Sequence, residues 1–574
     1  MFKYQRMKSK IYYFTSIVLT LIFLNGCEDY LDPEVVTYET YDQVTESYNY
    51  TKQRLSSVYS SIQPGFVRVG GAMMASASDE AEHTLETSAI QQFNVGSWNA
   101  YSNPDDVWAQ YYRGIYKANQ YMVSADSVNL DVFRLDPEQQ EVYELYVKEI
   151  ERWKSEARFL RALFYFELVK RYGGVPIITE AGSLDQDFSL VKRNTLEECI
   201  KFITDECDAC AGLLPERAAS FEDMGRATKG AALALKSRTL LYAASDLFNS
   251  SSWASDYANP ELIVLSGDRQ AKWQDAANAA KAVIDLARAG YSLANNYEDL
   301  FGPAGFNQSE VIFTDRDGNS NNFEIANFPI GYELGSSGTT PSQNLVDAYE
   351  DRTGLPIKDP GSIYNPADPY SNRDPRLKAT IVTNTSMFYN RPVEPFTGGL
   401  DGPPIAQASR TGYYLNKYVN QGLDLEAGQT SVHSWIIFRL AEIYLNYAEA
   451  LNEYDPGNSD IASYVNRVRS RAGMPGLSAG LSQDEMRERI RHERRIELAF
   501  EDHRLWDLRR WMEAEEVLSA PIEGVQITLN PADTTYTYQK VVVENRVFQP
   551  KMYLYPIPQS EIAIATGLIQ NPIW

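Results

Sequence analysis

The segment from Glu493 to Trp511 constrains the fold most, because it places arginines, carboxylates and large apolar side chains within the same few turns. Its apolar residues follow a helical spacing as far as Phe500 and again from Leu505, but the phase slips between the two stripes. We therefore predict two helices joined by a tight bend, as part of a helical unit over residues 484–515.

Charges of opposite sign lie three or four residues apart in this region, where side chains on one helix face can meet. The pairs are Glu485–Arg489, Arg489–Glu493, Glu501–Arg504 and Asp507–Arg510. We interpret them as a half-buried ion network that locks helices together. The alternative makes Glu497 and Glu501 the acid and base of a glycoside hydrolase. The neighbouring arginines argue against it, because they would lower the pKa of both glutamates.

Apolar residues at helical spacing recur along most of the chain, and one long helix is expected over residues 141–172, ending at Gly173. We predict a mainly α fold, in which tetratricopeptide-like helix pairs form a scaffold with large irregular loop insertions and a few short hairpins. The predicted pairs lie near 105–172, 195–249, 271–350 and 434–472, and the irregular, ligand-facing parts are mainly 63–104 and 291–430.

The first residues predict export and lipid anchoring. Four basic residues precede an uncharged stretch from Ile11 to Leu24, which is shorter than the roughly 20 residues of a membrane span but suits a secretory signal. Cys27 follows Leu24-Asn25-Gly26, a sequence similar to a lipobox. We predict a lipoprotein signal peptide at 1–26, a lipid on Cys27 and a single domain over 27–574.

Composition and motifs limit the classes of function that this chain can have. The net charge of −24 argues against nucleic-acid binding, which needs basic surfaces. No phosphate loop, dinucleotide fingerprint, nucleophile elbow or His-Glu-x-x-His motif is present. Cys207 and Cys210 fall within an expected amphipathic helix, so we interpret them as packed thiols rather than a zinc or redox site. We predict no metal and no cofactor.

Residues 315–322 form an acidic, Asn-rich run between Val311-Ile312-Phe313 and Phe323-Glu324-Ile325. The acidic residues suggest a calcium loop, but the glycine is misplaced for an EF-hand and the final acid is missing. We predict a hairpin turn, because Asp-Gly between strand-like runs is a strong turn signal.

Two loop regions supply candidate ligand contacts. Trp98, Asn99 and Tyr101 lie in a Gly- and Asn-rich segment and could form a platform for sugar rings. The alternative, that Trp98 fills the core from a loop, has equal weight. Tyr297, Phe301 and Asn319 are weaker candidates from the second irregular region.

Several segments resemble the SusD/RagB family of outer-membrane nutrient-binding lipoproteins. They are 439–450, 466–475, 493–511, Tyr172-Gly173-Gly174-Val175-Pro176 and Tyr555-Pro556-Ile557-Pro558. The family pattern usually has Gly at the position of Asp502. Glu28 and Asp29, directly after Cys27, resemble the acidic signal that sends Bacteroidetes lipoproteins to the cell surface.

The resemblance implies a cell-surface glycan-binding protein with no catalysis of its own. It implies that oligosaccharide is captured and delivered to a SusC-like TonB-dependent transporter, over which the protein acts as a lid. It also implies lipid anchoring in the outer membrane, facing the exterior. Capture of peptides by a RagB-like protein is the alternative within the family, and a surface glycoside hydrolase is the alternative from the enzyme class.

Overall fold

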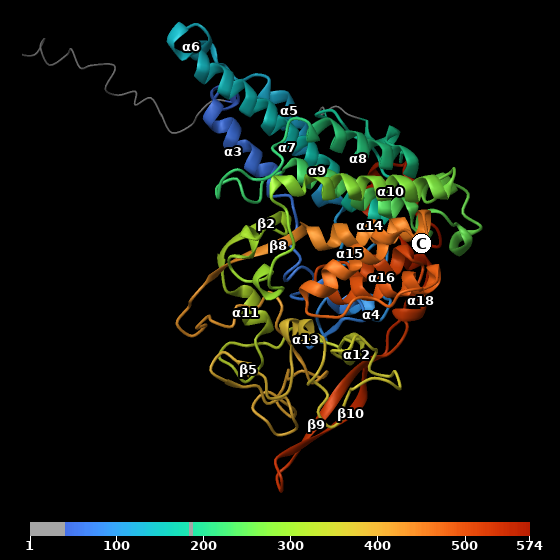
Figure 1. Ribbon diagram of the computed structural model, residues 1–574. Helices are drawn as coiled ribbons and strands as arrows, with labels where there is room; N and C mark the ends of the chain where they lie inside the picture. The colour runs from blue at the N-terminus through green and yellow to red at the C-terminus, as the bar shows by residue number, and fades with distance from the viewer. Residues whose placement is uncertain (1–40, 183–186) are drawn as a thin grey trace, which may run out of the picture.

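The computed structural model describes residues 41–182 and 187–574. Cys27 and the predicted signal peptide lie outside the described residues. Among the residues that are described, no helix combines the length and the apolar character needed to cross a membrane. The fold is mainly helical, as predicted (Figure 1).

The helices, in chain order, are α2 (Tyr41–Thr45), α3 (Tyr48–Tyr59), α4 (Gln91–Asn94), α5 (Trp108–Ala125), α6 (Asp131–Arg134), α7 (Gln140–Tyr172), α8 (Leu196–Ala211), α9 (Lys229–Ala244), α10 (Arg269–Ile284), α11 (Asn322–Asn327), α12 (Gln343–Ala348), α13 (Pro375–Thr380), α14 (Leu440–Tyr454), α15 (Ser459–Arg471), α16 (Gln483–Glu497), α17 (Arg504–Arg510), α18 (Ala514–Val517) and α19 (Gln559–Ile564). The long helix α7 and its end at Gly173, which has a φ of 74°, are confirmed.

The long helices stack in one array that forms the upper part of Figure 1. Consecutive neighbours are α5 and α7, α7 and α8, α8 and α9, α9 and α10, α10 and α14, and α14 and α15. Within the predicted ranges 105–172, 195–249 and 434–472, α5 packs on α7, α8 on α9 and α14 on α15. The pair at 271–350 is wrong, because α10 packs between α9 and α14. The chain leaves the array at Gly290, whose φ of 93° suits glycine and ends the helical run.

The strands are β1 (Ala81–His83), β2 (Val311–Ser320), β3 (Thr339–Pro341), β4 (Ile381–Val382), β5 (Met387–Phe388), β6 (Arg391–Pro392), β7 (Tyr414–Leu415), β8 (Ser431–Arg439), β9 (Ile522–Asn530) and β10 (Thr535–Glu544). They form two-stranded antiparallel sheets, and β5–β6 and β9–β10 are hairpins of neighbouring strands. The β5–β6 and β9–β10 hairpins and the loops around them form the irregular half at the bottom of Figure 1, whereas β2 and β8 lie at the level of α14 and α15.

The hairpin predicted within residues 315–322 is wrong. Strand β2 continues to Ser320 and pairs with β8, and Phe323 already belongs to α11. The Asp317-Gly318 pair occupies a bulge, because Arg316 faces Ser434 whereas Asn319 faces Val432. A partner strand from a distant part of the sequence thus overrides the local turn signal.

The predicted bend between α16 and α17 is confirmed. It turns through Phe500 and Asp502, which both have a φ of 61°. This left-handed conformation favours glycine, and aspartate tolerates it better than most residues. The chain therefore makes the bend without the glycine of the family pattern.

An ion network joins the helical array to the irregular half at this bend, as the structural interpretation predicted. Arg376 of α13, Arg439 at the end of β8 and Arg471 at the end of α15 all bond to the buried Glu497. Glu501 is bonded by Arg439 at 2.7 Å and by Lys417 at 2.6 Å. The network therefore connects elements that are far apart in the sequence.

The same contacts exclude Glu497 and Glu501 as an acid–base pair. Burial alone would raise the pKa of Glu497, but three guanidinium groups outweigh it and hold the pKa well below its usual range. The pKa of Glu501 is lowered in the same way, chiefly by Arg439 and Lys417 against the effect of burial. Both carboxylates stay ionised and have no access to a substrate.

Of the four local ion pairs predicted, only Asp507–Arg510 forms, at 2.8 Å. The others are replaced by different contacts. Arg489 pairs with Glu350, Arg504 pairs with Asp79, and Glu485 accepts a hydrogen bond from the backbone of Ser482 at the start of α16. Arg489 and Arg504 therefore pair with carboxylates on other elements and not with the carboxylates close to them in sequence.

Glu80 lies buried against the bend, where it accepts a hydrogen bond from the Phe500 backbone. Burial, and then the charge of Asp79, raise the pKa of its carboxyl to about 8. The folded state therefore holds a proton that the unfolded state releases above pH 4.5, so stability falls as the pH rises from 4.5 to 8.

Replacing Glu80 with glutamine should remove this pH-dependent loss of stability, because the glutamine side chain does not titrate. We expect the unfolding free energy of the variant to exceed that of the wild type by on the order of 2 kcal/mol at pH 8.5, and the difference to shrink towards pH 5. Chemical unfolding at both pH values measures it. A difference that is independent of pH would show that Glu80 is ionised in the folded protein.

Candidate functional site

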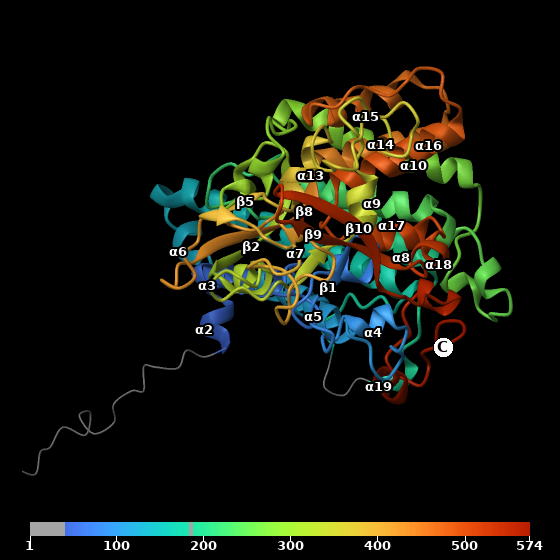
Figure 2. The ribbon, with the colours of Figure 1, turned by 90° about the horizontal axis from the view of Figure 1, so that it is seen from below.

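Trp98 does not lie on the surface. Its side chain is 1% exposed, and its ring packs 4.8 Å from Trp574 and 5.0 Å from Tyr555. The C-terminal segment covers the loop, and Gln559 donates a backbone hydrogen bond to Ala100. Figure 2 shows α19 and the C-terminus beside α4. The prediction of Trp98 as a sugar platform is corrected, because the core alternative describes its position.

Asn99 and Tyr101 are exposed at the tip of the same loop, with Tyr101 84% exposed. The Asn99 side chain accepts a hydrogen bond from the Tyr101 backbone at 2.9 Å and so stabilises the turn. Both residues remain predicted ligand contacts, but Trp98 does not extend the surface that they form.

Tyr297 and Phe301 are also buried, with 4% and 7% exposure. The Tyr297 hydroxyl donates to the Glu497 carbonyl at 2.9 Å and accepts from Lys417 at 2.7 Å. The Phe301 ring lies 4.1 Å from the Lys417 ammonium group. The prediction of these two rings as ligand contacts is corrected, because they pack around the ion network.

Asn319 is exposed and lines an open cleft of about 600 Å³. We call this the β2 cleft, and it lies between α3, the loop before α9 and the bulged end of β2. Its lining residues are Lys52, Leu55, Ser56, Tyr59, Glu222, Asp223, Met224, Gly225, Arg226, Arg316, Asp317, Gly318, Asn319 and Val432. A volume of this size falls within the range of small-molecule sites.

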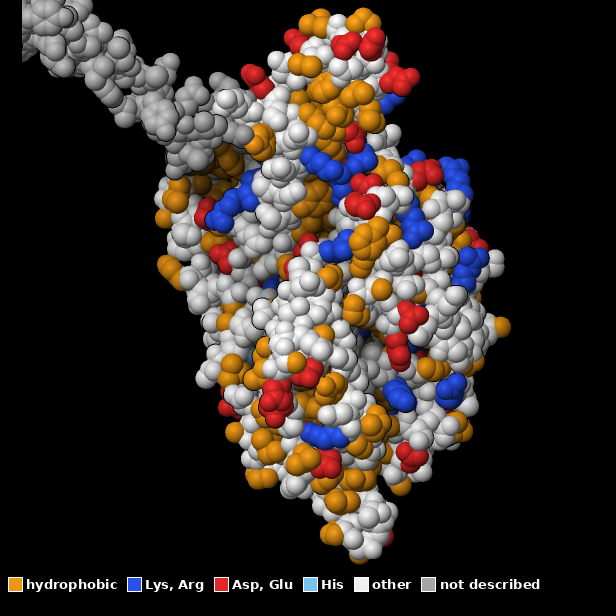
Figure 3. Space-filling view, turned by 90° about the vertical axis from the view of Figure 1, so that its left-hand side faces the viewer, with side chains coloured by type: hydrophobic (Ala, Val, Ile, Leu, Met, Phe, Trp, Pro, Cys, Tyr) orange, Lys and Arg blue, Asp and Glu red, His pale blue; other side chains and the backbone are white. Residues whose placement is uncertain are grey.

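Acidic and basic groups alternate around the β2 cleft. Figure 3 shows the left-hand face of Figure 1, where lysine and arginine side chains lie interspersed with carboxylates below the protruding helical tip. Arg226 is held by Glu156 at 2.7 Å, and Asp223 by Arg152 at 3.1 Å. These two cleft residues therefore have their partners inside the protein.

Arg316 differs from them, because no carboxylate among the described residues pairs with it. Its guanidinium group lies 4.0 Å from the Phe306 ring centre and 5.2 Å from that of Phe221, which is 56% exposed. The two phenylalanine rings pack against the planar guanidinium group of Arg316 and orient it, but they accept no N–H···O hydrogen bond from it. Arg316 therefore offers a donor group to a ligand in the cleft, and the exposed Phe221 lies beside it.

Two carboxylates precede Asn319 on β2. Burial raises the pKa of Asp317, and burial together with Asp317 raises the pKa of Asp315 to about 7. Sequence reasoning singled out this acidic run but missed Arg316 and the 222–226 loop. The Asp317-Gly318 pair within this run was the available signal of a site. It forms a bulge, and bulges often lie next to functional sites.

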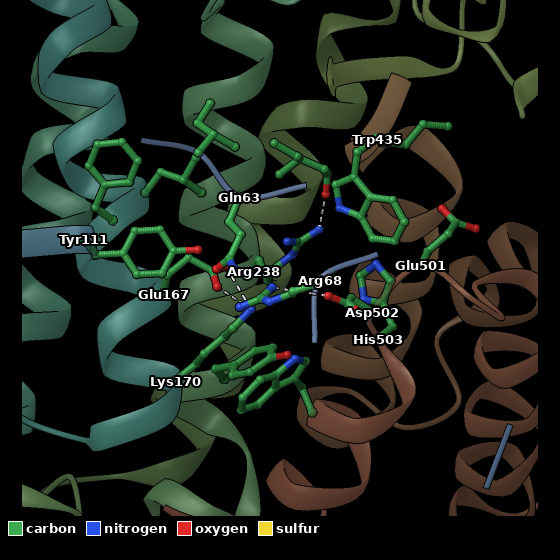
Figure 4. A pocket seen from close by; sticks show the side chains of 17 residues that line it. Gln63, Arg68, Tyr111, Glu167, Lys170, Arg238, Trp435, Glu501, Asp502 and His503 are labelled. Carbon is green, nitrogen blue, oxygen red and sulfur yellow. Dashed lines mark hydrogen bonds and ion pairs between the residues drawn. The ribbon is translucent and has the colours of Figure 1, made fainter. Parts of the chain in front are cut away.

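A second cavity, enclosed between α7 and the α16–α17 bend, has a volume of about 60 Å³. Figure 4 shows Arg68 and Lys170 facing Asp502 and His503 across it. Burial lowers the pKa of Lys170 to about 8, although Glu167 opposes this effect. A space of this size holds a few water molecules and excludes a sugar unit, so the β2 cleft is the candidate site.

No group of three or more histidine, cysteine, aspartate or glutamate side chains within 41–182 and 187–574 is arranged to hold a metal ion. Cys199, Cys207 and Cys210 are buried free thiols, which confirms the packed-thiol interpretation. Burial raises the pKa of Cys199 and of Cys210 to about 12, so neither thiol is reactive at neutral pH.

A helical-repeat scaffold that carries a loop-built half and an open polar cleft defines a class of ligand-binding scaffold proteins. Two family models match this chain: that of the SusD family over residues 309–574, and one described as starch-binding and associating with the outer membrane over residues 34–241. The chain belongs to the SusD family. The resemblance that the sequence motifs indicated is thereby confirmed.

Individual relatives agree with this assignment. SusD-like protein P2 of Formosa agariphila is 27% identical over 442 residues, which cover 75% of each chain. A SusD-like protein of Bacteroides fragilis has a solved structure with a TM-score of 0.77 and 27% identity, covering 93% of this chain and 99% of that one. A second structure from the same organism, described as a SusD-like carbohydrate-binding protein, has a TM-score of 0.73 and 26% identity over 92% of this chain and all of that one.

Proposed function

We propose that the protein captures oligosaccharides at the cell surface through the β2 cleft. The observation that carries the proposal is Arg316, a guanidinium group without a carboxylate partner, oriented by two phenylalanine rings in an open cleft. Aromatic rings stack on the C–H faces of sugars, and guanidinium and amide groups bond hydroxyls. The description of the relatives as starch- or carbohydrate-binding proteins supports this ligand class.

The proposed role in uptake follows from family membership. The protein delivers its ligand to a SusC-like TonB-dependent transporter and acts as the transporter's lid, anchored in the outer membrane by a lipid on Cys27. One family model is described as associating with the outer membrane, which supports this location. The ion network supports the lid role, because its ion pairs bond the helical array to the irregular half at the α16–α17 bend. No catalytic step is part of the proposal.

Peptide capture is the second candidate. The alternating charges of the β2 cleft favour it, because they could bond the polar backbone and the charged termini of a peptide. A hydrolase gains no support from Glu497 and Glu501, which are sealed in the ion network.

The test is calorimetry of the purified protein against a panel of oligosaccharides and a panel of short peptides. We expect one oligosaccharide to bind, and Arg316→Met to weaken its binding about tenfold or more through loss of charge-assisted hydrogen bonds. Asn319→Ala should weaken binding less, because an amide bonds less strongly than a charged group.

Tyr101→Ala is the matched control, because it removes an exposed aromatic side chain outside the cleft. If Tyr101→Ala abolished binding and Arg316→Met did not, the site would lie on the 99–101 loop. Binding of peptides alone would favour the second candidate, and release of reducing ends from the bound sugar would favour the hydrolase.

A further inference from the structure

A second open groove runs along α15, away from the β2 cleft, with a volume of about 800 Å³. We call it the α15 groove. One wall is a stripe of α15 residues at positions i, i+3, i+4, i+7 and i+8, which share one helix face. These residues are Ser463, Asn466, Arg467, Ser470 and Arg471, and the other lining residues are Tyr291, Ser292, Leu293, Ala294, Asn295 and Tyr444.

The chemical character of this lining is distinctive. It contains two arginines, serine hydroxyls and side-chain amides, and none of its residues is acidic. The chain as a whole carries a net charge of −24. An exposed arginine in a lining without acidic residues favours an anion over a cation.

Arg467 supplies an available charge. It is exposed, and its guanidinium group lies 4.5 Å from the Tyr464 ring centre and 5.8 Å from that of Tyr444. Among the described residues, no ion pair to a carboxylate engages it. The two tyrosines thus orient the guanidinium plane. Tyr444 also bonds one of its N–H groups, and the other donors face no carboxylate among the described residues.

Arg471 is the second arginine of the lining, and its charge is balanced by two buried carboxylates. Its side chain is 4% exposed, and its two terminal nitrogens are bonded to Glu310 and Glu497 of the ion network. Its Nε is buried and has no hydrogen-bond partner among the described residues. A buried donor without a partner is costly, and an acceptor brought by a ligand or by water would satisfy it.

We propose that the α15 groove binds an oxyanion, a carboxylate or a sulfate ester, carried on a sugar unit. Arg467 accepts the oxyanion in the two-pronged geometry that guanidinium groups make with such anions. The serine hydroxyls and Asn295 face the groove and bond the sugar hydroxyls. The saccharide part of this inference rests on the proposed function, whereas the oxyanion part stands on the lining of the groove alone.

The test titrates the purified protein with a galacturonate oligomer, its neutral methyl ester, a sulfated galactose oligomer and inorganic sulfate. We expect at least one anionic oligomer to bind, and Arg467→Met to weaken it about tenfold, because a charge-assisted hydrogen-bonding group is lost. The affinity should fall with added salt and stay constant from pH 6 to about 9, because arginine remains charged throughout.

Arg467→Lys and Arg134→Met are the controls. The lysine variant should recover part of the affinity through its charge. The Arg134 variant removes an exposed arginine of α6, outside both the groove and the β2 cleft, and should leave the affinity unchanged. Loss on Arg316→Met but not on Arg467→Met would overturn the inference, as would equal binding of the galacturonate oligomer and its ester or no binding of either anionic oligomer. Inorganic sulfate binding as tightly as the oligomers would overturn the saccharide part and identify a free anion as the ligand.

The result of this test can be distinguished from the result of the test of the proposed function. A neutral oligosaccharide that depends on Arg316 would support the β2 cleft whatever happens at the α15 groove. An anion that depends on Arg467 would support the groove even if the cleft bound nothing.

Discussion

Replacing Arg439 with methionine is expected to lower the free energy of unfolding by about 3–5 kcal/mol, the cost of breaking a buried ion pair from one side. Arg439 is 1% exposed and bonds Glu310, Glu497 and Glu501. Its removal leaves buried carboxylates short of positive charge in a region of low polarity. Calorimetry and chemical unfolding measure the loss.

The matched control is Arg134→Met. Arg134 pairs with Asp131 at 2.7 Å, but both side chains are more than half exposed. Exposed pairs of this kind contribute little to stability, so the melting temperature should barely change. The contrast between the two variants separates the effect of burial from that of ion pairing as such.

The pH dependence of Arg439→Met gives a second readout. The pKa of Glu497 is depressed in the folded protein, so the stability that the ionised carboxylate contributes is present near neutral pH and is lost as the pH falls through the folded pKa. Without Arg439 this pKa rises, so the loss of stability on acidification is smaller and is complete at a higher pH. Equal stability of the variant and the wild type at pH 7 would contradict the ion network as the joint between the halves.

Replacing Trp98 with alanine is expected to destabilise the protein by about 3–5 kcal/mol, as for other large aromatic side chains removed from a core. The ring packs among Phe93, Tyr555 and Trp574, so its removal opens a cavity beside the C-terminal segment. Trp98→Phe should restore much of the stability, because it refills most of that space. Thermal unfolding of both variants is the measurement.

Tyr101→Ala provides the comparison for Trp98. An exposed side chain of this kind changes stability by about 0.5 kcal/mol or less. If Trp98→Ala melted like the wild type but lost oligosaccharide binding, the ring would be a ligand platform after all. If it melted early and bound normally below its melting temperature, the structural role would be established.

Periodicity was sufficient to predict much of the scaffold. The long helix α7 and three helix pairs follow from apolar spacing and from stop signals such as Gly173. The pair expected after α10 failed for a physical reason: the second neighbour of α10 is α14, which follows an insertion of more than a hundred residues. Helical spacing predicts which face of a helix is buried but does not identify the helix that covers it.

The site was harder to predict, because exposure is a property of tertiary structure. Trp98, Tyr297 and Phe301 have the composition of a sugar platform, yet the C-terminal segment covers the first and the ion network surrounds the other two. The Asp317-Gly318 pair correctly indicated an irregular backbone, but not its type. Because β2 pairs with β8, the irregularity is a bulge within a strand and not a hairpin turn. Most of the ion pairs predicted within the 485–510 region do not form, because their charged side chains pair with residues on other elements of the fold.

The central claim, that the β2 cleft is the ligand site, is tested most directly by a crystal structure of the protein with the oligosaccharide that binds most tightly. We expect a sugar unit within hydrogen-bond distance of Arg316 and Asn319, beside the ring of Phe221. A sugar bound at the 99–101 loop, with the cleft empty, would contradict it.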